Sequence, residues 1–257
     1  MKMELRNLPE DNLKKMVNIM SDKYSRTLSI NSKESDFTIN FQDSIKLDQN
    51  LNYELGLLWF CAYNTIFNIT KDNNTFSYVS PPKFEDNIII IIEPGAYEIK
   101  DLNNILSKKT NGVIKIKMDL PTSKCIMTLE NIGIHFQNNS FFRTILGFTR
   151  NHYITPIVEN ITSENIIKII NTNTINIHCD CVTGSYNNGK QTNVLYSFPS
   201  NTVPMGYKIV ERMNPPNYLP LCRKYIMDIN FKILNQEGEL IDFNGEEISM
   251  YLHLKQV

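Results

Sequence analysis

The stretch from Tyr225 to Val257, YIMDINFKILNQEGELIDFNGEEISMYLHLKQV, decides the fold class. Polar and apolar residues alternate over Tyr225–Leu234, and a second apolar run covers Glu247–Leu254. Alternation with period two predicts half-buried strands, and Gly238 suits the turn because glycine enters positive φ without steric cost. We therefore expect a β-hairpin-like unit whose last strand lies inside a sheet, as in a closed or sandwiched all-β body. The alternation places these residues on one face: Tyr225, Met227, Ile229, Phe231 and Ile233.

The remaining chain repeats this pattern of short strands separated by Pro, Gly and Asn turns. Two short helices are predicted in the connections, over Ile99–Leu106 and Ser140–Gly147. Because strands and helices do not alternate regularly, a doubly wound sheet is disfavoured, and an all-β sandwich or jelly roll is predicted. The predicted strands are Phe37–Phe41, Tyr53–Tyr63, Thr75–Val79, Ile88–Glu93, Val113–Met118, Cys125–Leu129, Thr174–Val182, Val194–Phe198 and Tyr207–Glu211.

Two regions are predicted along the chain. Residues 1–30 carry leucine and methionine at helical intervals among charged residues, and Pro9 suits a first helical turn. We expect a helical N-terminal arm there, which packs either on its own domain or on a partner. Residues 31–257 contain no linker rich in Gly or Ser, and they are predicted to form one jelly-roll domain.

Composition narrows the class of protein. The chain has 257 residues, 42% of them hydrophobic, which is enough for one large β domain or two small ones. With 26 basic and 27 acidic residues, the net charge of −1 predicts no strong hold on nucleic acid. No signal peptide or membrane span is expected, because the apolar runs are short. An odd number of cysteines at unmatched spacings predicts reduced thiols in an intracellular compartment: Cys61, Cys125, Cys179, Cys181 and Cys222.

One segment differs at a single position from the sequence motif of a phosphate-binding loop. Gly184–Gln191 reads GSYNNGKQ, but Gln191 stands where a Ser or Thr hydroxyl must hold Mg²⁺. A helix is also required next, because its N-terminus helps to bind phosphate, whereas Thr192–Pro199 reads as a strand. We interpret this segment as a turn between strands.

Other candidate chemistry is equally incomplete. On a strand, Cys179 and Cys181 point to one face and His178 to the other, and two thiols fall short of the four ligands of a structural zinc site. The histidines are scattered over His135, His152, His178 and His253, and none belongs to a hydrolase motif. The acidic residues Glu93, Glu98 and Asp101 suit capping of the helix that follows.

The sequence therefore predicts no enzyme. It predicts no catalytic, cofactor-binding or metal-binding residue and no cofactor. Four tyrosines in or beside loops suit either loop packing or anchoring at an interface. They are Tyr186, Tyr196, Tyr207 and Tyr218.

Blocks of sequence along most of the chain resemble the penton (minor capsid) proteins of Polinton/Maverick elements and of related virophages and adintoviruses. The most specific blocks are IHCDCVTGSYNNG at Ile177–Gly189, VPMGYKIVE at Val203–Glu211 and GELIDFNGEEIS at Gly238–Ser249. Residues 1–30 take no part in the resemblance. The earlier blocks are Ile45–Asp48, Tyr53–Leu57, Tyr63–Ile69, Pro94–Asn103 and Leu146–Phe148.

The resemblance implies a structural protein of the virion, with a jelly-roll fold and no active site. It implies homopentamers at the vertices of an icosahedral shell, next to a double jelly-roll major capsid protein, with no membrane or specific nucleic acid as partner. Assembly would be intracellular, in either nucleus or cytoplasm. The alternatives are a β-sandwich carbohydrate-binding (lectin-like) module, a domesticated capsid gene and a cupin-type metal enzyme, the last disfavoured by the scattered histidines.

Overall fold

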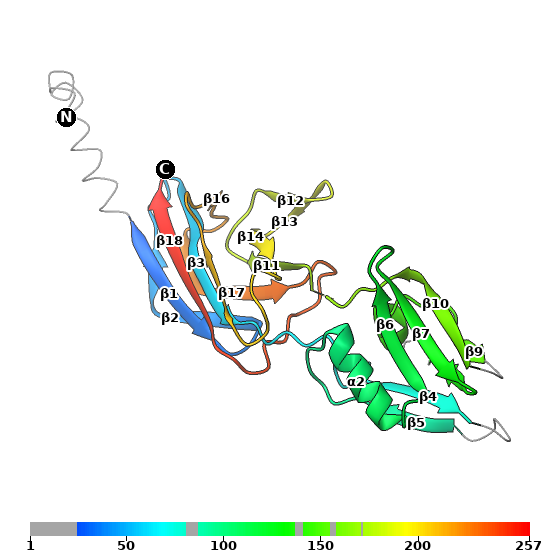
Figure 1. Cartoon of the computed structure of the whole chain (residues 1–257). Helices are drawn as coiled ribbons and strands as arrows, with labels where there is room; N and C mark the ends of the chain where they lie inside the picture. Colours follow the sequence, from blue (N-terminus) through cyan, green and yellow to red (C-terminus); the bar gives the residue numbers. More distant parts are fainter. Residues whose placement is uncertain (1–24, 81–86, 137–140, 155–157, 171) are drawn as a thin grey trace, which may run out of the picture. The chain divides into compact units, whose positions relative to one another are not determined.

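The computed structural model describes residues 25–80, 87–136, 141–154, 158–170 and 172–257 (Figure 1). It divides the chain into two compact units. Unit 1 contains the chain up to Thr65 and again from Thr172 to Val257, whereas unit 2 contains Ile66–Asn171. Unit 2 is therefore an insertion into the sequence of unit 1.

Unit 1 is built from two antiparallel sheets. The first sheet has the order β1-β18-β3-β15, and β16 also pairs with β3. The second has the order β14-β11-β17-β2. Strands of the first sheet are β1 (Arg26–Ser32), β3 (Tyr53–Tyr63), β15 (Lys208–Arg212), β16 (Tyr218–Pro220) and β18 (Ile248–Gln256). Strands of the second are β2 (Asp36–Lys46), β11 (Thr174–Cys179), β14 (Val194–Pro199) and β17 (Tyr225–Leu234).

The connectivity of these strands is that of a jelly roll. Along the chain, β1, β3, β15 and β18 belong to the first sheet, and β2, β11, β14 and β17 to the second. Most consecutive strands therefore cross from one sheet to the other, and the first strand ends up paired with the last, Arg26 opposite Leu254. Eight strands wound in this way form two four-stranded sheets, as expected for a jelly roll. The predicted all-β jelly-roll fold is confirmed.

The two sheets face each other across an apolar core. Phe60 of β3 packs on Phe198 of β14 with ring centroids 5.2 Å apart, and Phe243 lies 6.5 Å from Phe60 on another side. Inward residues of β17 and β18, such as Phe231 and Leu252, are completely buried. Burial of such side chains contributes about 2 kcal/mol each, which makes this core the main source of stability.

The last strand lies inside a sheet, as predicted, because β18 pairs with β1 on one side and β3 on the other. The predicted hairpin-like unit, however, is wrong, since β17 and β18 belong to different sheets. The chain turns at Gly238, where φ is +85°, and folds back only far enough to bridge Leu234 to Leu240. It then crosses to the other sheet.

The predicted face of β17 also changes along the strand. Ile226, Ile229, Phe231 and Ile233 are buried, whereas Tyr225 and Met227 are 51% and 58% exposed. The reason is an irregularity in the pairing with β2 between Ile226 and Asp228, where the ladder slips. A bulge of this kind reverses the alternation of inward and outward side chains.

Unit 2 has two antiparallel sheets and two helices, α2 and α3. One sheet has the order β5-β4-β8-β9 and the other β10-β7-β6. Their shared core includes Phe76, Ile92, Met127 and Ile134. The elements are β4 (Thr75–Val79), β5 (Asn87–Ile91), α2 (Ile99–Lys109), β6 (Ile114–Asp119), β7 (Lys124–Glu130), β8 (Gly133–His135), α3 (Phe141–Ile145), β9 (His152–Ile154) and β10 (Val158–Ile166).

Helix α2 contributes its apolar face to this core, with Leu102 and Leu106 completely buried. The carboxylate of Asp101 accepts a hydrogen bond of 3.2 Å from the backbone N–H of Glu98. That contact is the capping role predicted for the acidic residues near Pro94, because the first N–H groups of a helix have no partner within it.

One buried side-chain amide joins the two ends of unit 2. The side-chain nitrogen of Asn68 donates to the carbonyls of Tyr97 at 2.8 Å and Ile169 at 3.0 Å, and its oxygen accepts from the N–H of Tyr97 at 2.9 Å. Asn68 and Ile169 lie near the two ends of the insertion, and these ends are therefore joined inside unit 2. This contact helps to make unit 2 a compact body.

The division into units differs from the predicted single domain over residues 31–257. The junctions at Thr65–Ile66 and Asn171–Thr172 contain no glycine, serine or proline, so composition does not mark them. Of the predicted arm, residues 1–24 lie outside the described residues. Residues 26–30 belong to β1, so the jelly roll begins earlier than predicted. Among the described helices, none combines the length and the apolar character needed to cross a bilayer.

Candidate functional site

The segment that resembles a phosphate loop forms a small hairpin in unit 1. Strands β12 (Ser185–Asn187) and β13 (Lys190–Thr192) pair antiparallel, with Asn187 opposite Lys190. The turn between them is Asn188-Gly189, with φ of +49° and +77°, which is the backbone of a tight hairpin turn. The interpretation as a turn is confirmed, because a strand rather than a helix follows the lysine.

The cysteine cluster lies where β11 ends. The Sγ atoms of Cys179 and Cys181 are 3.2 Å apart and both thiols are completely buried. The hydrogen bond between the two sulfur atoms, together with burial, raises the pKa of the Cys179 thiol well above its ordinary value. A thiol held in the protonated form is a poor nucleophile and a poor metal ligand.

The carboxylate of Asp180 lies with these thiols, and the three ligand atoms fall within 4.8 Å of one another. This carboxylate is already engaged, because it accepts from Arg223 at 2.9 Å and from the backbone N–H of Asn230 at 3.0 Å. Three ligand atoms do not make the four-ligand site of structural zinc. The structure therefore gives no support to a metal role for this cluster.

Among the described residues, no three histidines lie close enough together to share a metal ion. His135 and His152 are opposite each other on β8 and β9 of unit 2. His178 and His253 lie in different sheets of unit 1, on β11 and β18. A cupin-type metal site needs several histidines around one ion, so this arrangement disfavours that alternative.

His253 is tied to two neighbours on unit 1. Its Nδ1 lies 2.9 Å from the hydroxyl of Tyr218, and its Nε2 lies 2.5 Å from Oγ of Ser25. Burial and the nearby charge of Lys255 lower the pKa of His253. The ammonium of Lys255 lies 3.7 Å from the centre of the Tyr218 ring and forms an ion pair with Glu54. These contacts join strands β3, β16 and β18, so we assign the imidazole a structural role.

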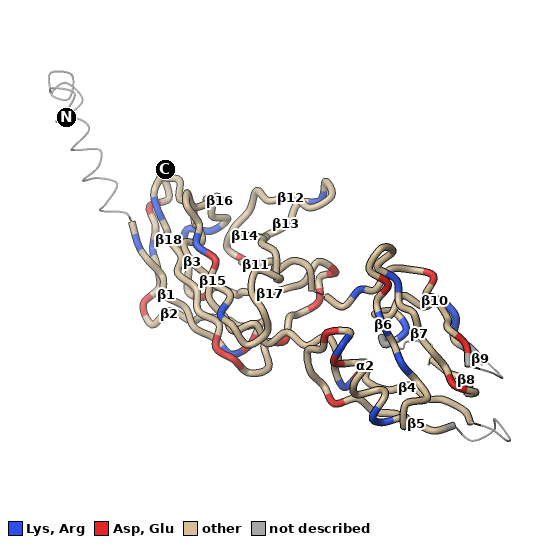
Figure 2. Tube along the Cα trace, in the orientation of Figure 1, with Lys and Arg blue, Asp and Glu red and all other residues tan. Residues whose placement is uncertain are grey.

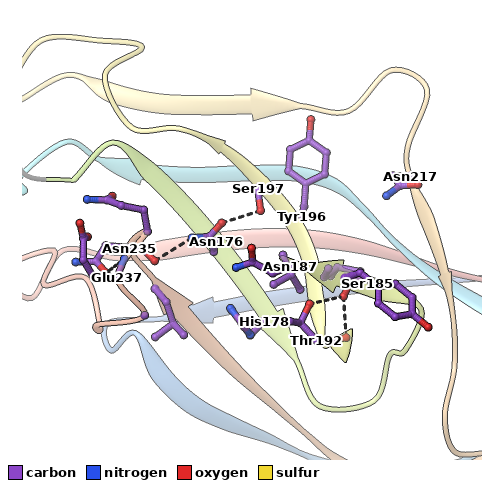
Figure 3. Close-up of a pocket in the computed structure, with 16 residues that line it drawn as sticks. Asn176, His178, Ser185, Asn187, Thr192, Tyr196, Ser197, Asn217, Asn235 and Glu237 are labelled. Carbon is purple, nitrogen blue, oxygen red and sulfur yellow. Dashed lines mark hydrogen bonds between the residues drawn. The ribbon is translucent and has the colours of Figure 1, made fainter. Parts of the chain in front are cut away.

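A polar groove of about 590 Å³ is the strongest candidate site (Figure 3). One wall is the β12–β13 hairpin, the floor is formed by β11 and β14, and the far end is the turn after β17. The floor is held by its own hydrogen bonds. Asn176 donates to the carbonyl of Asn235 at 2.9 Å and accepts from Ser197 at 2.7 Å, and Nδ1 of His178 lies 2.9 Å from Oδ1 of Asn193.

Two of the four tyrosines singled out in the sequence line this groove, Tyr186 on β12 and Tyr196 on β14. Tyr186 is 70% exposed, and Tyr207 is 66% exposed elsewhere on unit 1, whereas Tyr196 and Tyr218 are partly buried within strands. Sequence reasoning missed the groove itself. Its asparagines are separated along the chain, and asparagine is abundant throughout, so no local pattern marks them.

No protein-family model matches this chain, and no curated protein matches its sequence. A solved structure does resemble it. The penton protein of mavirus shares 12% sequence identity with the chain, and the match covers 91% of this chain and 99% of the mavirus protein. The TM-score is 0.49.

Proposed function

We propose that this protein is a penton (minor capsid) protein that forms pentameric vertices of an icosahedral shell. The observation that carries the proposal is the ordered set of penton-like blocks together with the strands they occupy. Ile177–Gly189 runs from β11 into the β12–β13 hairpin, Val203–Glu211 leads into β15, and Gly238–Ser249 joins β17 to β18. A jelly roll alone does not fix function, so the blocks supply the specificity.

Charge distribution supports this role. Acidic and basic residues are interspersed along the described trace of both units (Figure 2). A surface of mixed charge suits a shell protein whose contacts are with other proteins, because a genome-binding surface concentrates Lys and Arg on one face. The partners proposed here are further copies of this chain and a double jelly-roll major capsid protein, and the place of action is the virion.

The proposal predicts a ring of five chains. Light scattering of the purified protein, alone and co-expressed with a double jelly-roll capsid protein, measures the mass against the 29.8 kDa monomer. We expect a particle of five times the monomer mass, and negative-stain images with fivefold symmetry. A closed ring uses the same heterologous contact at each junction, so intermediate masses should be scarce.

A protein that stays monomeric, both alone and beside the major capsid protein, would contradict the proposal.

A further inference from the structure

The polar groove on unit 1 has a chemistry that the proposed shell function does not use. Among the described residues that line it there is no Lys or Arg, and Glu237 is the only Asp or Glu. Lys190 of the hairpin is not among them. Phosphates and other anions would therefore meet no cation in the groove, and a cationic ligand would meet a single carboxylate. The lining favours a neutral ligand.

The polar groups of the groove fall into two sets. The first set is fixed, because Asn176, His178 and Ser185 are held by hydrogen bonds to Asn235, Asn193 and Thr192. The second set lines the groove and has donors and acceptors that are not used in hydrogen bonds with other described residues. Within the described part of the chain, no hydrogen bond is formed by the side-chain amides of Asn187 and Asn217 or by the hydroxyls of Tyr186 and Tyr196. A rigid floor with open polar groups above it is a preorganised site.

The open groups fit sugars. Each amide offers both a donor and an acceptor, which matches the hydroxyl groups of a carbohydrate, since a hydroxyl also donates and accepts. The ring of Tyr186, which is 70% exposed and also lines the groove, offers a flat apolar face. Polar groups in small number beside an aromatic surface are the usual composition of a site that fixes the orientation of a small ligand.

We propose that this groove binds a neutral carbohydrate. The amides of Asn187 and Asn217 hydrogen-bond its hydroxyl groups, and the ring of Tyr186 packs against an apolar face of the sugar. The inference goes beyond the proposed shell function and does not depend on it, because the groove is complete within one chain. Loss of binding and loss of assembly are therefore separate results.

Saturation-transfer NMR on the full-length protein tests the inference with a panel of neutral saccharides: glucose, galactose, mannose, N-acetylglucosamine and short oligomers of each. We expect saturable binding to at least one member, with a dissociation constant of about 0.1–10 mM, typical of a small polar ligand. Tyr186→Ala and Asn187→Ala should each weaken it by about tenfold or more, because each removes a direct contact.

Tyr207→Ala is the matched control, since this tyrosine is 66% exposed but does not line the groove. It should bind as the unmodified protein does. Thermal melts of all three variants verify that they fold. Three results would overturn the inference: no saturable signal from any member of the panel, binding that is indifferent to both groove variants, or a clear preference for an anionic probe such as MgATP or for an extended peptide.

Discussion

Gly147 shows how strongly a single position is constrained. It follows α3 with a φ of +80°, as expected for a glycine that ends a helix. A Cβ built there would lie 2.3 Å from the carbonyl oxygen of Asn165, which is backbone and cannot rotate away. Gly112, also in unit 2, has a similar φ of +84°, but its nearest neighbour to a Cβ is 3.9 Å away.

We expect Gly147→Ala to lower the stability of unit 2 by about 3 kcal/mol or more, and Gly112→Ala by about 1 kcal/mol. The first change adds a collision to the backbone strain, and the second adds strain alone. Urea unfolding followed by circular dichroism measures both variants. Equal losses would show that the close approach to Asn165 has no energetic weight.

His253 makes unit 1 sensitive to pH. Folding lowers the pKa of His253 below its ordinary value of 6.5, so the unfolded chain takes up a proton first as the pH falls. The contribution of neutral His253 to the free energy of unfolding is therefore complete above pH 6.5. It decreases as the pH falls from 6.5 to the lower pKa of the folded protein, and it is constant below that pKa. The groups that face the imidazole are Ser25, Tyr218 and Lys255.

His253→Gln should flatten the loss of stability between about pH 8 and pH 5, because Gln does not titrate. Fluorescence of Trp59, the one tryptophan of the chain, reports unit 1, since its ring lies 5.4 Å from Tyr251 on β18. If the stability of the variant and that of the unmodified protein decrease with pH by the same amount, His253 is not the group responsible.

Single residues also show which features could be predicted from the sequence and which could not. Gly238 was predicted in a turn and Gly147 at the end of a helix, because the need for positive φ is local. Asn68 was not singled out, because its partners Tyr97 and Ile169 are 29 and 101 residues away. The alternation over Tyr225–Leu234 was predicted correctly as a strand, but the slip that reverses its face depends on the partner strand β2.

At the level of elements, apolar strands were predicted well and polar strands were missed. β3 was predicted with its exact ends, because both of its faces are apolar, and it lies in the middle of its sheet between β18 and β15. β10, with the sequence VENITSENI, carries mostly polar residues at the edge of its sheet and was not predicted. An edge strand gains its partner from tertiary structure, so its own pattern is weak.

The insertion is an element in its own right. Its core includes Phe76, Leu102 and Met127, and Asn68 joins its two ends. We therefore expect residues 66–171, expressed alone, to fold cooperatively, with dispersed amide NMR signals and a single thermal transition. A fragment of the same length, residues 26–131, separates β1 and β2 from their partners β18 and β17 and should stay unfolded. Similar spectra from both fragments would contradict the division into units.

At the scale of the whole molecule, the period-two alternation of residues predicted the all-β class, and the resemblance to penton proteins predicted the jelly-roll topology. The pairing of β1 with β18 joins residues at opposite ends of the chain, and no local pattern encodes a register of that length. The boundaries of the insertion were not predicted, because neither junction contains the glycine, serine or proline that would mark a linker. The groove was missed because it assembles from four separate segments of unit 1.

The closure of the insertion by Asn68 has a consequence for how such a chain can change. Since both ends of residues 66–171 meet at one amide, the insertion leaves and re-enters the sequence of unit 1 at neighbouring points of its own structure. Exchange of unit 2 for a foreign domain with adjacent termini should leave every strand of the jelly roll in place. The two units can thus be altered independently, and the junctions at residues 65 and 172 are natural points at which to graft another domain.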